Sequence, residues 1–228
     1  MSSIVPVDSQ SLLRFLQKWH GEPNSPTSKS ATPNLAPEAL IHWHEISSQW
    51  SDGITFHNYA IPLPELEIED GKVPFWVENQ GTWLWSFDPH DPNHPVYEKE
   101  PSSDSAPWVA TGEKLSDFLV HATVFEAVLG APATKVAFGI SDDFLWVRDE
   151  TRPLPFPAWN WPAPGSRIAI GEDWLALMHP SDAPAAGYDV TLAATAPEHL
   201  TWAENASGIE WTSYSSSENV TADEPLPW

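Results

Sequence analysis

The stretch that decides the fold is residues 73–97, VPFWVENQGTWLWSFDPHDPNHPVY. Its segments PFWVEN and TWLWSF have the character of two adjacent β-strands. In the second, Trp83, Trp85 and Phe87 fall at every other position, which is the period of a strand with two distinct faces. Gly81 between the segments can adopt the positive φ that a short hairpin turn commonly requires. The stretch therefore predicts a β-hairpin whose aromatic side chains must be covered on at least one face.

Three amphipathic segments supply helices that can cover this hairpin. Residues 10–20 carry a broad apolar stripe, and residues 38–50 follow Pro37 and place tryptophans at helical spacing. Residues 115–129 have the three-and-four spacing of a buried helical face. Residues 54–61 alternate and predict one further strand before the hairpin.

After residue 130 the pattern changes to short runs that are typical of strands. These runs are 135–140, 144–148, 167–170, 174–178, 188–193 and 210–214. Between them, residues 153–165 hold too many prolines for a helix or a central strand. The order of elements predicts an α+β fold with a mainly antiparallel sheet covered by helices. We expect residues 1–130 to form the core and residues 131–228 to be a β-rich part that completes the same domain.

Charge and composition limit the classes of function. The 228 residues include 32 acidic and 10 basic residues, a formal charge of −22, and residues 1–130 alone carry a net charge of −12. Such a field repels nucleic acid and anionic membranes and attracts basic proteins, although solubility alone also explains an acidic surface. The absence of Cys excludes disulfides and thiol chemistry. With no signal-like N-terminus and no apolar run of about 18 residues, the chain is expected to be soluble and cytoplasmic.

Several motifs occur in an order that resembles a known family. They are PEALIHWHEISSQW from Pro37, ENQG from Glu78, WLW from Trp83, HPV from His94, Trp108 and LSDFL from Leu115. In this order they are similar to the SUKH superfamily (SMI/KNR-like proteins), and the similarity covers roughly residues 10–130. The family's DPPV turn is expanded here to DPNHPV, and only Gly53 represents the glycine-rich segment after the second helix.

The resemblance implies binding rather than catalysis, with no cofactor. Bacterial SUKH proteins are largely immunity proteins that bind and neutralise polymorphic toxins, many of them nucleases, and fungal members act as interaction modules. The expected partner is therefore a cognate protein toxin that meets an acidic, aromatic-lined surface. The alternative is a carbohydrate- or peptide-binding module, which the fourteen tryptophans suggest and which requires exposed Trp side chains. The sequence leaves the identity of the toxin and the oligomeric state open.

Two groups of residues are candidates for the partner-binding surface. The first group is Glu78, Asn79 and Gln80 at the hairpin turn. These residues either line a partner-binding groove or use their side chains to satisfy backbone groups at the turn. The second interpretation is favoured. Trp83 and Trp85 share one strand face and are expected in the core or in a groove wall. The acidic run provides Glu65, Glu67, Glu69 and Asp70, which alternate as in a solvent-facing edge strand and are also candidates for contact with a basic toxin.

Catalytic and metal sites have little support in the sequence. The chain has no GxSxG, P-loop or GxGxxG motif. Asp88, His90, Asp91 and His94 gather in one Pro-rich loop, but their spacing matches no metal-binding motif, and no metal is expected there. His42 and His44 lie two residues apart on different sides of a helix, so they do not chelate one ion together.

Overall fold

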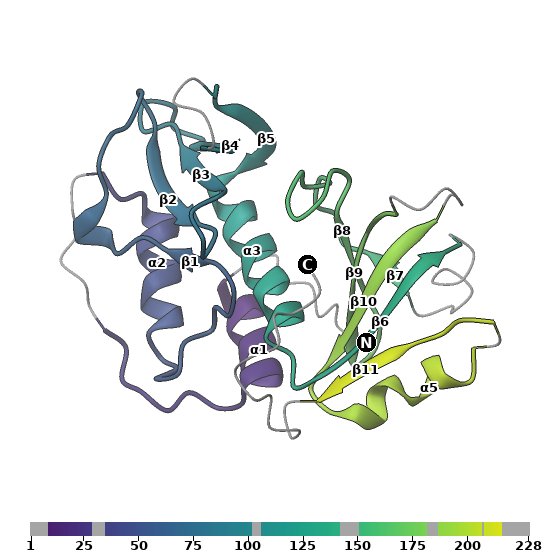
Figure 1. Ribbon diagram of the computed structural model, residues 1–228. Coiled ribbons are helices and arrows are strands. Elements are labelled where there is room, and N and C mark those ends of the chain that lie inside the picture. The colour runs from purple at the N-terminus through teal and green to yellow at the C-terminus, as the bar shows by residue number, and fades with distance from the viewer. Residues whose placement is uncertain are drawn as a thin grey trace. The chain divides into compact units, whose positions relative to one another are not determined.

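The computed structural model describes residues 9–28, 35–101, 106–141, 151–181, 187–206 and 208–215 (Figure 1). Contacts divide the chain into two compact units. The first consists of residues up to Gly130 together with Pro155–Pro157, and the second of Ala131–Leu154 and the residues from Ala158 onward. Both units combine antiparallel sheet with helix, which confirms the predicted α+β class.

The sheet of the first unit is an antiparallel meander. Its strands are β1 (Tyr59–Ala60), β2 (Val73–Val77), β3 (Leu84–Phe87), β4 (Pro95–Lys99) and β5 (Val109–Lys114), in the order β1-β2-β3-β4-β5. The predicted hairpin is confirmed as β2 and β3, in which Trp76 lies opposite Trp85. At its turn Gly81 has φ 71° and donates its N–H to the Glu78 carbonyl at 2.8 Å. Glycine suits this position because it carries no Cβ.

The unit has three helices: α1 (Ser9–His20), α2 (Glu38–Ser47) and α3 (Leu115–Leu129). Of these, α2 and α3 place aromatic rings against the sheet, and α1 donates the Nε1–H of Trp19 to the Ala127 carbonyl of α3 at 2.8 Å. The central one is α3, where every residue from His121 to Val128 is buried. Its Phe118 contacts the aromatic rings of both hairpin strands, with Phe75 at 5.2 Å and Trp85 at 5.8 Å between ring centroids. The α2 side chain Trp43 donates its Nε1–H to the Thr123 hydroxyl of α3 at 2.9 Å. The three predicted helices are confirmed, with α2 ending at Ser47 rather than at residue 50.

Two predictions for the segment before the hairpin are wrong. The strand expected at 54–61 is only β1, because the backbone of residues 56–58 bonds to a side chain of α3 instead of a neighbouring strand. The acidic run is not an edge strand either. It starts in the 3-10 helix η1 (Leu63–Glu65), and Leu63 and Leu66 are buried three residues apart. Pro64 has no N–H for a strand ladder, and a spacing of three matches a helical turn rather than a strand.

The second unit contains a separate six-stranded antiparallel sheet in the order β11-β6-β10-β9-β8-β7. The strands are β6 (Ala133–Ile140), β7 (Arg152–Pro153), β8 (Arg167–Ile170), β9 (Trp174–Pro180), β10 (Tyr188–Ala194) and β11 (Thr212–Ser215). Between β10 and β11 lie η2 (Pro197–Leu200) and the short α5 (Thr201–Glu204), whose Leu200 and Ala203 enter the core of this unit. Five of the six predicted strand runs are confirmed, 167–170 with the bounds of β8 and the other four with shifted ends, and 144–148 lies outside the described residues.

The two sheets share no strand among the described residues. That residues 131–228 complete the same domain as residues 1–130 stays a prediction. None of the helices in the described part of the chain combines the length and the hydropathy that a membrane span needs.

Candidate functional site

An exposed aromatic edge stands out on the first unit. In the loop before β1, Phe56 is 62% exposed, and in β1 itself Tyr59 is 47% exposed. Between them Asn58 is only 2% exposed. The described sheet ends at β1, so these side chains lie at its edge. Large apolar side chains held outward at a sheet edge are a candidate for contact with another protein.

A buried glutamate on α3 holds the backbone of this edge. Glu126 is 1% exposed, and its Oε2 accepts the backbone N–H groups of Phe56 and His57, each at 2.7 Å. Its Oε1 accepts the N–H of Asn58 at 3.1 Å. Burial raises the pKa of Glu126 to about 7, while these backbone donors act in the opposite direction. One carboxyl group on a rigid helix thus determines the path of the loop that carries Phe56.

A second buried carboxylate joins this loop to the hairpin turn. Glu78 is 3% exposed, and its Oε2 accepts the N–H of Gln80 at 2.9 Å and the hydroxyl of Thr82 at 2.8 Å. Its Oε1 lies 3.1 Å from Nε2 of His57. Burial acts to raise the pKa of Glu78, but the hydrogen bonds from Thr82 and Gln80 outweigh it, and the pKa is lowered. Glu78 therefore supports the turn from within, while Asn79 and Gln80 are exposed beside it.

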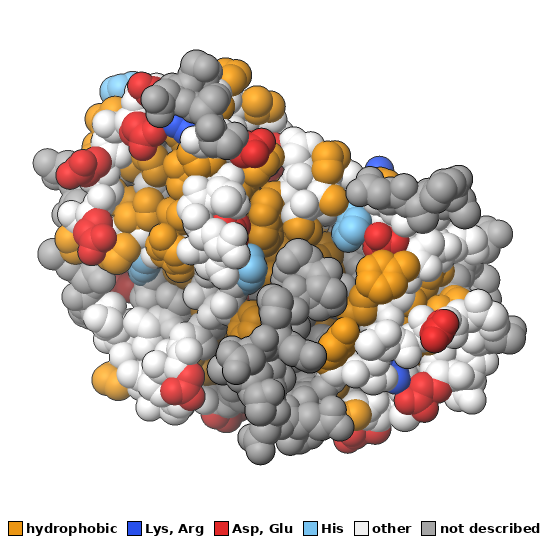
Figure 2. Space-filling model, in the orientation of Figure 1, with side chains coloured by type: hydrophobic (Ala, Val, Ile, Leu, Met, Phe, Trp, Pro, Cys, Tyr) orange, Lys and Arg blue, Asp and Glu red, His pale blue; other side chains and the backbone are white. Residues whose placement is uncertain are grey.

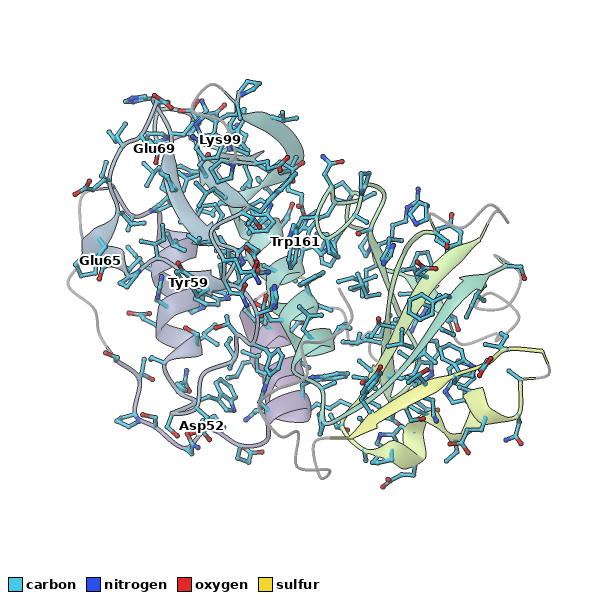
Figure 3. All side chains as sticks on the ribbon, in the orientation of Figure 1. Asp52, Tyr59, Glu65, Glu69, Lys99 and Trp161 are labelled. Carbon is cyan, nitrogen blue, oxygen red and sulfur yellow. The ribbon has the colours of Figure 1, made fainter. Side chains whose placement is uncertain are left out.

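The acidic residues lie on the same face of the unit as the aromatic edge. Figure 3 shows Tyr59 near the middle of this face, with Asp52, Glu65 and Glu69 toward its margin. Glu67 is also exposed. Glu69 is paired at 2.9 Å with Nζ of Lys99, and Asp70 lies 4.0 Å from the same atom.

Apolar side chains accompany these acids at the surface. Ile68, within the acidic run, is 52% exposed. Figure 2 shows hydrophobic side chains gathered on this face of the first unit with acidic side chains around them. We use the name acidic aromatic face for the exposed residues between positions 52 and 70: Tyr59, Asp52 and Glu65, which Figure 3 labels, and their sequence neighbours Phe56, Glu67 and Ile68.

The two candidate tryptophans of the hairpin lie elsewhere. Trp85 is fully buried against Phe118, and Trp83 is half-buried and donates its Nε1–H to Oε2 of Glu98 at 3.3 Å. Trp85 therefore belongs to the core. Every tryptophan in the described part of the chain is buried or half-buried, so these residues offer no exposed ring platform.

The polar residues of the Pro-rich loop at 88–94 stabilise the conformation of the loop itself. Asp88 pairs with Lys72 at 2.9 Å and accepts the N–H of His90, and Asp91 accepts the N–H of Asn93 at 2.8 Å. The ring of His94 packs edge-on against Phe87 at 5.7 Å. Within the described ranges, no three His, Asp or Glu side chains come together as a possible set of metal ligands.

The sequence pattern predicts the hairpin turn and the acidic run as parts of the candidate site, but it does not predict a role for Phe56, His57, Tyr59 or Glu126. One signal was available for Glu126. It stands between Phe125 and Ala127 in a helix that is apolar on almost every side, so its carboxyl group must be buried and needs donors. Nothing in the sequence says that these donors are the N–H groups of residues 56–58.

Comparison of the chain with models of protein families, with curated proteins and with solved structures finds no match.

Proposed function

We propose that this protein is a non-catalytic immunity protein that binds and neutralises a basic polymorphic toxin through the acidic aromatic face. The resemblance to SUKH proteins suggests this class, and many toxins neutralised by that family are nucleases. The observation that carries the proposal is the 47% exposure of Tyr59 on the face that also bears Asp52, Glu65 and Glu69, with Phe56, 62% exposed, in the loop just before β1. Such a protein acts in the cytoplasm, before the toxin reaches its target.

The charge of the first unit supports a basic partner. Residues 1–130 carry a net charge of −12, and bases pair with part of the acidic set, as Lys99 does with Glu69. Glu65 and Glu67 are exposed to solvent. A field of one sign increases the association rate with a partner of opposite charge and disfavours other partners.

The aromatic edge supports the affinity of the complex. Exposed aromatic side chains that become buried in an interface provide much of the binding free energy, whereas charges at the rim mostly affect association. Because Glu126 and Glu78 hold the loop and the turn, Phe56 and Tyr59 are already ordered before binding, which lowers the entropy cost of association. The absence of exposed tryptophan among the described residues gives no support to a sugar-binding platform.

The proposal predicts that a basic polypeptide is encoded next to this protein's gene, and it is tested with that polypeptide. Cells that express this polypeptide are expected to stop growing, and co-expression of the wild-type protein is expected to restore growth. Calorimetry on the purified pair measures the dissociation constant. Phe56→Ala and Tyr59→Ala are each expected to cost about 2 kcal/mol, or roughly 30-fold in Kd, because each removes an exposed aromatic anchor.

Tyr214→Ala is the matched control, because Tyr214 is 41% exposed but belongs to the second unit. It is expected to leave Kd unchanged. A partner that binds Phe56→Ala and Tyr59→Ala as tightly as the wild type would show that another surface carries the interaction. Failure of co-expression to restore growth, with the protein folded, would rule out neutralisation.

A further inference from the structure

A pocket of about 500 Å³ lies between α1, α2 and the start of α3. Every residue that lines it belongs to the first unit, and none of them belongs to the acidic aromatic face. Pockets of roughly 300–1,000 Å³ are typical of sites that enclose a small molecule. The pocket is therefore a candidate site for a ligand that is distinct from the partner of the acidic aromatic face.

Most of the pocket lining is apolar and firmly packed. The helices contribute six apolar residues to it, which are Leu12, Ala39, Trp43, Ile46, Leu119 and Val120. The indole of Trp43 is held by its hydrogen bond to Thr123 and by edge-on packing at 5.2 Å against Trp76. Because the protein's own packing orders these side chains, an apolar group that binds against them incurs little entropy cost on the side of the protein.

One wall of the pocket comes from Pro155, Phe156 and Pro157. The ring of Phe156 stacks on the imidazole of His121, with 4.5 Å between ring centroids and an interplanar angle of 12°. Nδ1 of His121 in turn lies 3.0 Å from Oε1 of Glu113, which also lines the pocket. The aromatic wall is therefore fixed in position by the protein itself.

Opposite charges stand together at the solvent-exposed side of the pocket. Lys114, at the end of β5, and Asp117, in the first turn of α3, both line it, and their side chains are 57% and 53% exposed. Nζ of Lys114 lies 3.9 Å from Oδ2 of Asp117. An exposed ion pair of this kind contributes little to stability, so each group can turn toward a ligand charge at little cost. The pocket thus offers a cation and an anion next to each other, beside an apolar lining.

We infer that this pocket binds a free amino acid with a large apolar side chain. The ammonium and carboxylate groups of an amino acid are attached to one Cα, so they match an anion and a cation that lie 3.9 Å apart. The ammonium group pairs with Asp117 and the carboxylate with Lys114, while the side chain lies against Trp43. A ligand with a single charge would meet a like charge at one of the two groups, which disfavours it relative to a dipolar ligand.

The test is isothermal titration calorimetry of the full-length protein with three probes that share a phenyl ring. L-phenylalanine carries both charges, phenethylamine carries only the ammonium group, and 3-phenylpropionate carries only the carboxylate. L-phenylalanine is expected to bind about ten-fold more tightly than either analogue, because each analogue lacks one charge-assisted contact. The experiment contains no toxin, so its outcome does not depend on the proposed function.

Two variants assign the charged contacts. Asp117→Asn is expected to weaken the binding of L-phenylalanine and phenethylamine about ten-fold, but not that of 3-phenylpropionate. Lys114→Met is expected to weaken L-phenylalanine and 3-phenylpropionate, but not phenethylamine. The matched controls are Asp52→Asn and Lys18→Met, which make the same changes in net charge at exposed positions of the first unit outside the pocket lining. Both controls should bind the three probes as the wild type does.

A steric variant tests the pocket independently of charge. Ala39→Leu adds a larger side chain to the pocket lining and should weaken the binding of all three probes, and urea unfolding checks that each variant is folded. The inference would be overturned by any of four results: no detectable binding of L-phenylalanine, equal affinities for L-phenylalanine and its analogues, equal losses in Asp52→Asn and Asp117→Asn, or unchanged binding in Ala39→Leu.

Discussion

Glu126 gives the sharpest prediction, because one buried carboxyl group holds the loop that carries Phe56. Replacement of Glu126 by Gln keeps the size of the side chain and one carbonyl acceptor but removes the ionisable group. The structure sets two opposing effects on this group. Three backbone N–H groups favour the charged form, and burial of a side chain that is 1% exposed disfavours it. Burial is the larger effect, and it raises the pKa to about 7.

The sign of the pH dependence follows from this direction. The pKa of Glu126 is higher in the folded protein than in the unfolded chain, so its contribution to stability is fully present below the unfolded pKa near 4.5 and is lost as the pH rises through about 7. With these two pKa values, proton linkage predicts that the free energy of unfolding falls by about 2 kcal/mol between pH 5.5 and pH 8. Glu126→Gln cannot undergo this loss, because the amide does not ionise.

The assay is urea unfolding of the wild type and of Glu126→Gln at several pH values from 5.5 to 8. The measured quantity is the difference in free energy of unfolding between the wild type and Glu126→Gln. The contributions of other titrating groups are common to both proteins and cancel in this difference. His20 and His44, whose pKa values are lowered by burial, are among these groups. The wild type is expected to lose about 2 kcal/mol relative to the variant over this range. Glu65→Gln, at an exposed position, serves as the control and should follow the wild type. A difference that stays constant with pH would refute the reasoning.

Two further substitutions test how the hairpin and the core are held. Gly81→Ala places a side chain at φ 71°, and no atom lies within 4 Å of the new Cβ. Backbone strain alone should therefore lower the free energy of unfolding by about 1 kcal/mol. A loss below a few tenths of that value would mean that the turn relaxes. Thr123→Val leaves the buried indole N–H of Trp43 without its 2.9 Å acceptor and should cost about 1–3 kcal/mol in the same urea assay. An unchanged midpoint for Thr123→Val would show that the indole finds another acceptor.

Local patterns were sufficient for elements whose side-chain period is regular. The apolar spacing of residues 115–129 predicts α3 with its observed bounds, and the alternating tryptophans with Gly81 predict the β2–β3 hairpin. Residues 167–170 coincide with β8 for the same reason. In these segments the local preference and the tertiary packing agree, so neither has to override the other.

The pattern failed where a long-range contact determines the backbone. Residues 54–58 alternate like a strand, yet the N–H groups of residues 56–58 bond to Glu126, about 70 positions later in the chain. The acidic run also alternates in charge, but Leu63 and Leu66 are buried three residues apart, so the run begins at the last residue of η1 instead of in a strand. Alternating charges stabilise a strand less than the burial of two leucines stabilises a turn, because burial of each large apolar side chain contributes about 1.5–3 kcal/mol.

The candidate site was predicted only in part for a related reason. Exposed Asn79, Gln80, Glu65 and Glu67 were found because polar residues at turns are expected at the surface. Phe56 and Tyr59 were missed because alternation of large residues normally indicates burial, and only the edge position of β1 leaves them exposed.

Hydrogen–deuterium exchange of this protein with and without its basic partner tests the central claim most directly. If the acidic aromatic face binds the toxin, peptides that cover residues 54–70 should gain protection in the complex, whereas peptides that cover β8 and β9 should exchange as in the free protein. Protection confined to the second unit, or no change over residues 54–70 in a saturated complex, would contradict the account.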